Sequence, residues 1–465
     1  MSETLVRHKP MMTMRQILLM NVGFFGIQYS FGMQQTAINP IYTMLGASPE
    51  DLPLLNLAGP VTGLLVQPLI GAMSDRTWSD RWGRRKPYFI VGAIGCSLCL
   101  FLFPLVSALW MAVLLLWLLD ASNNTAMEPY RAFIADKLPP SQLAKGFLAQ
   151  SFFTGLGITL ANLSLGLFKE LFEASTAAGL PYWVFGAFWL GAICSIASVL
   201  VSVLKTSEIP PSEAERNALR KKKGDPLGAL KEIVSAIVEM PVELRKLALV
   251  YLFQWYAMQC YWQFVSLSIA KSSFGVPVEL LGLPREELVL SHPEQAAALD
   301  DAIAWTGYVN GFYNIVTFCV AFFLVALARR RGAKMVHALC LLCATVGLLI
   351  FPHVTDRVLL FLPIVGLGIA WASIMGVPYI MATRMVPSNR YGVYMGIINM
   401  MIVVPMLIQN LTFGSVYRLI GSDPGNAITF AAILLGLAAL AMLWIKEPPI
   451  VRDVDEVTAA AKVER

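Results

Sequence analysis

The sequence predicts an all-α integral membrane protein. Of its 465 residues, 57% are hydrophobic and only 14% are charged, and the mean hydropathy is +0.64. A water-soluble protein of this length cannot bury that much apolar surface. The apolar residues fall in long continuous runs rather than in alternating segments of about ten residues, which argues against an outer-membrane β-barrel.

Twelve segments are long and apolar enough to be membrane-spanning helices, each of which needs roughly 20 residues to cross a hydrocarbon core about 30 Å thick. They lie near residues 14–40, 54–74, 87–106, 109–135, 145–168, 182–204, 246–270, 303–328, 335–352, 358–383, 391–418 and 426–445. The first is too long for the apolar region of a cleavable signal peptide, so we expect it to remain as a span.

The basic residues predict how the chain is oriented. With twelve crossings and an internal N-terminus, nearly all of the 35 Lys and Arg residues lie on the side of the N-terminus. Arg131 falls inside a span, and five lie opposite: Lys169, Lys271, Arg285, Arg357 and Arg418. This asymmetry predicts cytoplasmic termini and a cytoplasmic (inner) membrane location. The net charge of +5 then reflects topology, and we expect no nucleic-acid partner.

The spans group as six plus six. We expect an N-terminal six-helix half over 1–204, a cytoplasmic linker over 205–245 and a C-terminal six-helix half over 246–465. The second part of the linker predicts a helix on the membrane surface, with one apolar face made by Leu227, Leu230, Ile233, Val234 and Ile237. Two halves related by a repeat, with substrate held between them, are typical of secondary transporters.

Cysteine and histidine give no sign of a metal site or an enzyme. All seven cysteines fall within apolar spans, and the two C-x-x-C pairs, at 96–99 and 340–343, have no histidine beside them. We expect packing roles, no metal and no cofactor. The four histidines lie near termini, loops or a membrane edge, so no cluster of catalytic groups at one depth is predicted.

The fourth span carries charges where lipid is expected. Asp120, Asn124, Glu128 and Arg131 fall within about 80° of one another on a helical wheel, which predicts one stripe facing the bundle interior. Asp120 lies about 16 Å along the helix from its start, close to the bilayer centre. Glu128 and Arg131 are three residues apart and can form an ion pair.

Asp120 has no cationic partner in its own helix. Arg131 is eleven residues away, about 16 Å along the axis, which is beyond direct contact. An unpaired carboxylate at the membrane centre costs at least about 2.5–3.5 kcal/mol, and protonation removes that cost. We therefore predict that Asp120 couples transport to a proton, with Glu128 and Arg131 assisting. A structural polar contact between helices is the alternative.

The loop after the second span has a recognisable pattern. Its short, glycine-hinged, charged turn carries Gly71, Asp75, Arg76, Gly83, Arg84 and Arg85. This turn resembles the one that marks the major facilitator superfamily, and it is echoed six spans later by ARRRGAK. The resemblance implies twelve transmembrane helices in two six-helix halves. We predict that Asp75, Arg76, Gly83, Arg84 and Arg85 form a cytoplasmic gate, in which the acid pairs with arginines or a helix N-terminus.

Four segments resemble one branch of that superfamily, the plant sucrose–proton symporters with their animal and bacterial relatives. They are FGIQYSFGMQQTAINPIY, SDRTWSDRWGRRKPYF, WLLDASNNTAMEPYRAFIAD and GVYMGIINMMIVVPMLIQN. The resemblance implies proton-coupled transport of sucrose, maltose or related glucosides, with Asp120 at the position of the family's protonatable aspartate. Glu128 and the seventh span, FQWYAMQCYWQF, depart from the plant pattern.

A sugar site needs neutral hydrogen-bonding groups beside aromatic faces, and the interior spans supply both. The predicted sugar-binding residues are Gln28, Gln35, Asn123, Asn124, Trp255, Tyr256, Gln259, Asn310, Tyr313, Asn314, Tyr379 and Asn399. Amides and aromatics without acid clusters favour a neutral polyol over a cationic drug or a phosphate. For each single residue, helix–helix packing or an interfacial aromatic position is the alternative.

These observations predict a monomeric proton–disaccharide symporter, not an enzyme. It would bind a neutral sugar and a proton, and the two halves would rock about the site. A sodium-coupled sugar carrier, a facilitative uniporter and a channel are the alternatives, and the sequence does not determine which sugar is carried.

Overall fold

The computed structural model describes residues 9–172, 174, 181–210, 235–385 and 391–447. The described residues form helices and connecting loops without strands, except for one isolated bridge between Ser79 and Gly83. The predicted all-α class is confirmed. The expected surface helix of the linker falls mostly on residues outside the described ranges.

The first half begins with an interrupted span. It comprises α1 (Met14–Asn21), α2 (Gly23–Met33), the π-helical segment η1 (Gln34–Ile38) and α3 (Asn39–Met44). It was expected as a single helix over 14–40. The remaining elements are α4 (Leu52–Leu55), α5 (Ala58–Arg76), α6 (Lys86–Leu102), η2 (Phe103–Leu105), α7 (Leu109–Lys137), α8 (Pro140–Leu171) and α9 (Tyr182–Lys205).

The second half starts after the linker. Its helices are α12 (Val242–Phe274), η3 (Val278–Leu280), α13 (Arg285–Ser291), α14 (Pro293–Arg331), α15 (Ala333–Ile350), η4 (Phe351–His353), η5 (Val358–Leu360), α16 (Phe361–Met385), α17 (Tyr391–Leu419) and α18 (Pro424–Leu443).

Among the described helices, eight spans are long and apolar enough by themselves to cross a membrane. They correspond to α5, α6, α8, α9, α15, α16, α17 and α18. The other four expected spans are α1–α3, α7, α12 and α14. These four carry many of the buried amides and the acid that form the candidate site below, and such polar residues lower the hydropathy of a span.

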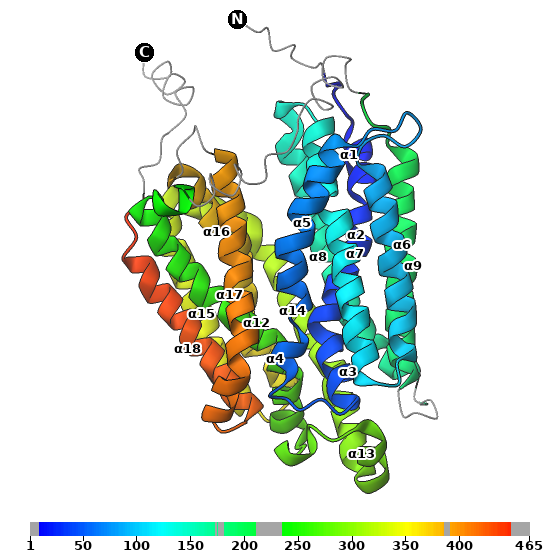
Figure 1. Cartoon of the computed structure of the whole chain (residues 1–465). Coiled ribbons are helices and arrows are strands. Elements are labelled where there is room, and N and C mark those ends of the chain that lie inside the picture. Colours follow the sequence, from blue (N-terminus) through cyan, green and yellow to red (C-terminus); the bar gives the residue numbers. More distant parts are fainter. Residues whose placement is uncertain (1–8, 173, 175–180, 211–234, 386–390, 448–465) are drawn as a thin grey trace, which may run out of the picture.

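The helices pack into two groups that meet along a central seam (Figure 1). In the first half α2 packs on α8 and α9, α6 packs on α7 and α9, and α5 packs on α7. In the second half α12 packs on α17 and α18, and α15 packs on α16 and α18. Across the seam α8 packs on α14, and α17 packs on α4 and α5.

We call the two ends of the molecule the α1 end and the α13 end, after the helices that Figure 1 labels there. The α13 end carries the segment between α12 and α14. A buried ion pair holds it, because Arg285 Nη2 lies 2.5 Å from Asp300 Oδ2. Pro284 of this segment packs against Gly46 of the first half, where an added Cβ would lie 3.1 Å from Pro284 Cγ. The segment therefore contacts both halves.

Small residues allow the helices to approach closely. A Cβ at Gly157 of α8 would lie 2.3 Å from the Phe25 carbonyl oxygen and 3.0 Å from the Tyr29 amide nitrogen of α2. Both obstacles are backbone atoms, which cannot move aside cheaply. Helices in membranes associate by close packing through small residues, because the surrounding lipid is as apolar as their side chains and supplies no hydrophobic driving force.

We therefore predict that Gly157→Ala destabilises the folded protein by about 1–3 kcal/mol, the usual cost of overpacking. The measurement is thermal unfolding of the detergent-purified protein, followed by tryptophan fluorescence. The matched control is Gly396→Ala in α17, where an added Cβ meets nothing within 4 Å. Equal melting temperatures for the two variants would show that the α2–α8 approach is looser than described.

Candidate functional site

Asp120 lies in the middle of α7 and is 2% exposed. Its carboxyl faces α5, where a Cβ at Gly59 would lie 3.7 Å from Oδ2, and it lies beside Gln34 of the π-helical segment. Within the described part of the chain, Asp120 Oδ1 has no hydrogen-bond partner and no ion pair involves the residue. The acid is buried between helices and does not face lipid.

The stripe predicted on α7 faces α5 along its length. Asn124 donates from Nδ2 to Thr62 Oγ1 at 3.0 Å and accepts at Oδ1 from Gln67 Nε2 at 2.7 Å. Asn123, on an adjoining face, donates to Ser30 Oγ of α2 at 2.8 Å. Both asparagines are buried, so amide hydrogen bonds hold α7 against α5 on one face and against α2 on the adjoining face.

Glu128 and Arg131 lie further toward the α1 end. The predicted ion pair is present, with Arg131 Nη1 3.7 Å from Glu128 Oε2. Their side chains are 38% and 45% exposed, respectively, so solvent screening leaves this pair a weak contributor to stability. Glu128 points toward Gly71 of α5, on the same side as Asp120 and Asn124.

The second half contributes a cluster of three tryptophans. The Trp371 ring in α16 packs edge-on against Trp255 at 5.7 Å and against Trp262 at 5.3 Å between ring centroids. Trp262 Nε1 donates to the Tyr313 hydroxyl at 3.3 Å. Trp255 Nε1 is buried and, among the described residues, has no acceptor. An unpartnered buried donor beside aromatic faces is a place where a ligand hydroxyl can bind.

Amides of α12 and α17 form a second polar group. Gln263 Nε2 donates to Asn410 Oδ1 at 2.8 Å, and Gln259 Nε2 reaches the same oxygen at 3.4 Å. Asn410 Nδ2 in turn donates to the Asn56 carbonyl of the first half at 2.9 Å. Gln259 therefore belongs to a network that crosses the seam.

The remaining predicted sugar-binding residues differ from one another in burial and in hydrogen bonding. Gln28 is buried, with Nε2 3.9 Å from Met127 Sδ, whereas Gln35 and Asn399 are half-buried. Tyr256 is bonded to Thr412 at 2.9 Å between α12 and α17, in a partly exposed position. In this conformation Asn314 Nδ2 donates to the Asn310 carbonyl at 2.8 Å. The side chain of Tyr379 is outside what the structure describes.

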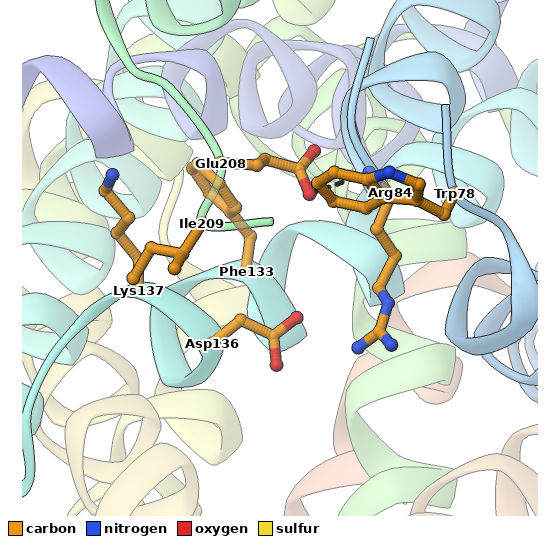
Figure 2. Close-up of a pocket in the computed structure, with 7 residues that line it drawn as sticks. All are labelled: Trp78, Arg84, Phe133, Asp136, Lys137, Glu208 and Ile209. Carbon is orange, nitrogen blue, oxygen red and sulfur yellow. Dashed lines mark hydrogen bonds between the residues drawn. The ribbon is translucent and has the colours of Figure 1, made fainter. Parts of the chain in front are cut away.

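The predicted cytoplasmic gate lies at the α1 end, and Figure 2 shows one of its residues, Arg84, near Glu208 and Asp136. Gly83 has φ +79°, the left-handed conformation that favours glycine, and Arg85 is buried. The Arg85 guanidinium donates to Asp136 Oδ2 at 2.9 Å and to Ser74 Oγ at 2.6 Å. It thereby joins the ends of α5 and α7. The side chains of Asp75 and Arg76 are not described.

Glu208, just after α9, caps the N-terminus of α6. Its carboxylate accepts from the backbone amides of Arg84 and Arg85 at 2.8 Å and of Lys86 at 3.0 Å. Anions are favoured at a helix N-terminus, where amides are unsatisfied and the helix dipole is positive. Burial lowers the pKa of Lys137, and the Glu208 carboxylate opposes this shift.

The second half repeats this arrangement. Glu447, just after α18, accepts from the amides of Ala333 and Lys334 at 2.9 and 3.1 Å, at the N-terminus of α15. Gly332 has φ +96°, as Gly83 has φ +79°. The two carboxylate caps occupy equivalent places in the two groups of helices, as an internal repeat predicts.

Several residues of the site were missed from sequence. Glu208 and Glu447 share a signal that could have been read, since both follow a lysine and precede a Pro-Pro pair in KTSEIPP and KEPP. Trp371 gave no distinguishing signal among eleven tryptophans. His337 was expected near a membrane edge. It is fully buried between Ser373 Oγ at 2.8 Å and Gln254 Oε1 at 3.0 Å.

Buried polar groups gathered where two groups of membrane-spanning helices meet are typical of secondary transporters rather than of enzymes. The chain belongs to the Major Facilitator Superfamily, whose family model matches residues 20–410. Among the described residues, no group of three or more His, Cys, Asp or Glu side chains is placed to hold a metal ion.

Two plant relatives cover most of the chain at low identity, and a human relative covers less than half of it. Sucrose transport protein SUT5 of rice (Oryza sativa) is 24% identical over 90% of this chain and 85% of its own length. Sucrose transport protein SUC4 of Arabidopsis thaliana is 22% identical over 91% and 89%. The human proton-associated sugar transporter A is 29% identical, over 44% of this chain and 29% of its own length.

Solved structures share the fold. A point mutant of the nucleoside transporter NupG has a TM-score of 0.69 at 14% identity, covering 93% of this chain and all of its own. The inward-open xylose transporter XylE of E. coli has a TM-score of 0.62 at 16% identity, covering 96% of this chain and 98% of its own. Identities this low establish the fold alone.

The carboxylate caps generate a prediction about local opening. Glu208→Ala removes the acceptor for three amides, so we expect faster hydrogen–deuterium exchange in peptides covering residues 83–88. Glu208→Gln keeps an acceptor without the charge and should give an intermediate rate.

Glu447→Ala is the matched control, and it should accelerate exchange at residues 332–336 instead. If Glu208→Ala leaves exchange at 83–88 unchanged, the carboxylate does not cap α6.

Proposed function

We propose that this protein is a proton-coupled symporter that imports a disaccharide or a related glucoside, such as sucrose or maltose, by alternating access. The observation that carries the proposal is the buried carboxyl of Asp120 at mid-depth in α7, which forms no ion pair with any described residue and whose Oδ1 has no hydrogen-bond partner among them. The sucrose transport proteins and the proton-associated sugar transporter among the relatives support the substrate class and the coupling ion.

Proton coupling follows from the surroundings of Asp120. Tyr42 of α3 and Cys96 of α6 interact electrostatically with the carboxyl, while Gln34 and Gly59 lie against it. Among these neighbours there is no cation to stabilise a buried negative charge. The ionised form is therefore costly wherever water is excluded, and the acid must be neutral when it is occluded. Gaining a proton on one side and losing it on the other is what symport requires.

Sugar binding is supported by the second half. The cluster of Trp255, Trp262 and Trp371 offers aromatic faces, and Trp255 Nε1 is a free donor within the described structure. The buried amides of α12 and α17 provide further donors and acceptors. A neutral polyhydroxyl ligand matches such a set better than a charged ligand does.

Alternating access is supported by where contacts across the seam occur. Arg418 pairs with Glu50, Lys169 with Asp301, and Tyr308 with Glu170, and all of these pairs lie near the α13 end. With the α1 end cytoplasmic, as the basic residues predict, this is a state closed toward the outside. When the α13 end opens toward the outside, these contacts would break.

The coupling role of Asp120 is tested with Asp120→Asn in proteoliposomes. One proton crossing 100 mV supplies about 2.3 kcal/mol, which sustains roughly a fifty-fold sugar gradient. The wild type should accumulate labelled sucrose or maltose when energised. The variant should lose accumulation but retain sugar counterflow, which needs no net proton movement.

Asp51→Asn, which makes the same change at an exposed position of the α13 end, is the control and should behave as the wild type. Accumulation that survives in Asp120→Asn, or that follows a sodium gradient in the wild type, would exclude this coupling. Equilibration without accumulation in the wild type would indicate a uniporter.

The sugar-binding role of the tryptophan cluster makes a second prediction. Trp255→Phe keeps a ring but removes the Nε1 donor, so the KM for sugar should rise about two- to tenfold, the effect of one neutral hydrogen bond. Trp110→Phe, at a position that is 68% exposed, is the control and should leave the KM unchanged. An unchanged KM in Trp255→Phe would remove this tryptophan from the sugar site.

A further inference from the structure

The π-helical segment Gln34–Ile38 interrupts the first span at the level of Asp120. A π-helical turn inserts one residue into a helix and is uncommon, and such turns occur frequently at functional sites. In this molecule the segment lies between the candidate coupling acid in the first half and α14 and α12 of the second half.

One side of the segment faces the acid. The Gln34 side chain lies beside the Asp120 carboxyl, yet Gln34 Nε2 and Asp120 Oδ1 are both buried and, among the described residues, unpartnered. A neutral carboxyl accepts a hydrogen bond from the Gln34 amide only weakly. An ionised carboxylate attracts it strongly, because hydrogen bonds to charged acceptors are about twice as strong as neutral ones.

The other side of the segment holds the second half. The Thr36 hydroxyl donates to Asn162 Oδ1 of α8 and accepts from Asn310 Nδ2 of α14 at 2.8 Å. Asn310 Oδ1 accepts from the Tyr261 hydroxyl of α12, also at 2.8 Å. We name these four residues the Thr36 bridge. All four are at most 2% exposed, and Thr36 links the halves within it.

Asn39, which directly follows the segment, also bonds to the second half. Asn39 Nδ2 donates to the Trp262 carbonyl of α12 at 3.4 Å, and Asn39 Oδ1 accepts from Asn56 Nδ2 at 2.6 Å. Within residues 34–39, Gln34 therefore lies against the acid, while Thr36 and Asn39 form hydrogen bonds with α14 and α12 of the other half.

We propose that the segment Gln34–Ile38 couples the charge of Asp120 to closure at the α13 end, with Gln34 responding to the carboxyl and Thr36 holding Asn310. When Asp120 loses its proton, Gln34 turns toward the carboxylate, the segment rewinds, and the Thr36 bridge weakens. The α13 end then opens. Protonation releases Gln34 and restores the bridge. The inference rests on the proposed role of Asp120 in proton coupling, and it assigns Gln34, Thr36 and Asn310 as positioning residues.

The titratable groups that interact with Asp120 are Tyr42 of α3 and Cys96 of α6. The Tyr42 hydroxyl donates to the Leu55 carbonyl at 3.5 Å, and Cys96 lies beside Ser30 and Ser195. From α5 the neighbour is Gly59, which does not titrate. Among Asp120 and these neighbours, Asp120 is the carboxyl. Replacing it should therefore remove the dependence of α13-end opening on pH.

The test is the distance between spin labels at the α13 end, measured by pulsed electron paramagnetic resonance without sugar. The labels are attached at Leu54→Cys in α4 and Leu419→Cys in α17, in a chain whose native cysteines are replaced by alanine. These positions are 50% and 85% exposed and belong to different halves. In the otherwise unaltered protein, raising the pH should increase the population with the longer distance.

Asp120→Asn, Gln34→Leu and Thr36→Val should each abolish this pH response, and Thr36→Val should also favour the longer distance at every pH. Thr36→Ser keeps the hydroxyl and should restore the response. Thr345→Val, at a threonine bonded within its own helix α15, should leave the response intact. A normal response in Thr36→Val or in Asp120→Asn overturns the inference.

Sugar counterflow of the same proteins separates this inference from the proposed function. A wild type with the pH response but no sugar counterflow contradicts the proposed function and leaves the coupling segment standing. Proton-driven sugar uptake by a wild type that shows no pH response contradicts the coupling segment alone.

Discussion

The cost of a charge in an apolar interior governs the arrangement of this transporter. Asp120 is buried at the middle of α7 with one carboxyl oxygen unsatisfied within the described structure. Other buried charges have an ionic partner: Arg285 pairs with the buried Asp300, and Arg85 pairs with the partly exposed Asp136. A buried acid with no cationic partner among the described residues is energetically costly, and natural proteins retain such groups at functional sites.

Neutral hydrogen bonds, by contrast, hold the two halves together near that acid. The Thr36 bridge and the amide network of Gln263, Asn410 and Asn56 are uncharged, and all of these residues are buried except the half-buried Asn56. Each can break and re-form without desolvating an ion, which suits an interface that must open in every cycle. The ion pairs that cross the seam, such as Arg418 with Glu50, lie further out and are partly exposed.

Features that depend on one helix were predictable from sequence, and features that depend on contacts between helices were not. The stripe on α7 and the ion pair of Glu128 with Arg131 follow from a period of 3.6 residues. The break of the first span into α2, η1 and α3 does not, because its polar partners Asn162 and Asn310 lie 126 and 274 residues away. The cap formed by Glu208 is equally remote from Arg84, 124 residues earlier.

The central claim is that loading with sugar and protonation of Asp120 occur together. The direct measurement is proton uptake by the purified protein in weakly buffered detergent solution when sucrose or maltose is added, followed with a pH indicator. We expect uptake of about one proton per molecule in the wild type and none in a variant with a neutral residue at position 120. Sugar binding with no proton uptake, or equal uptake by that variant, would contradict it.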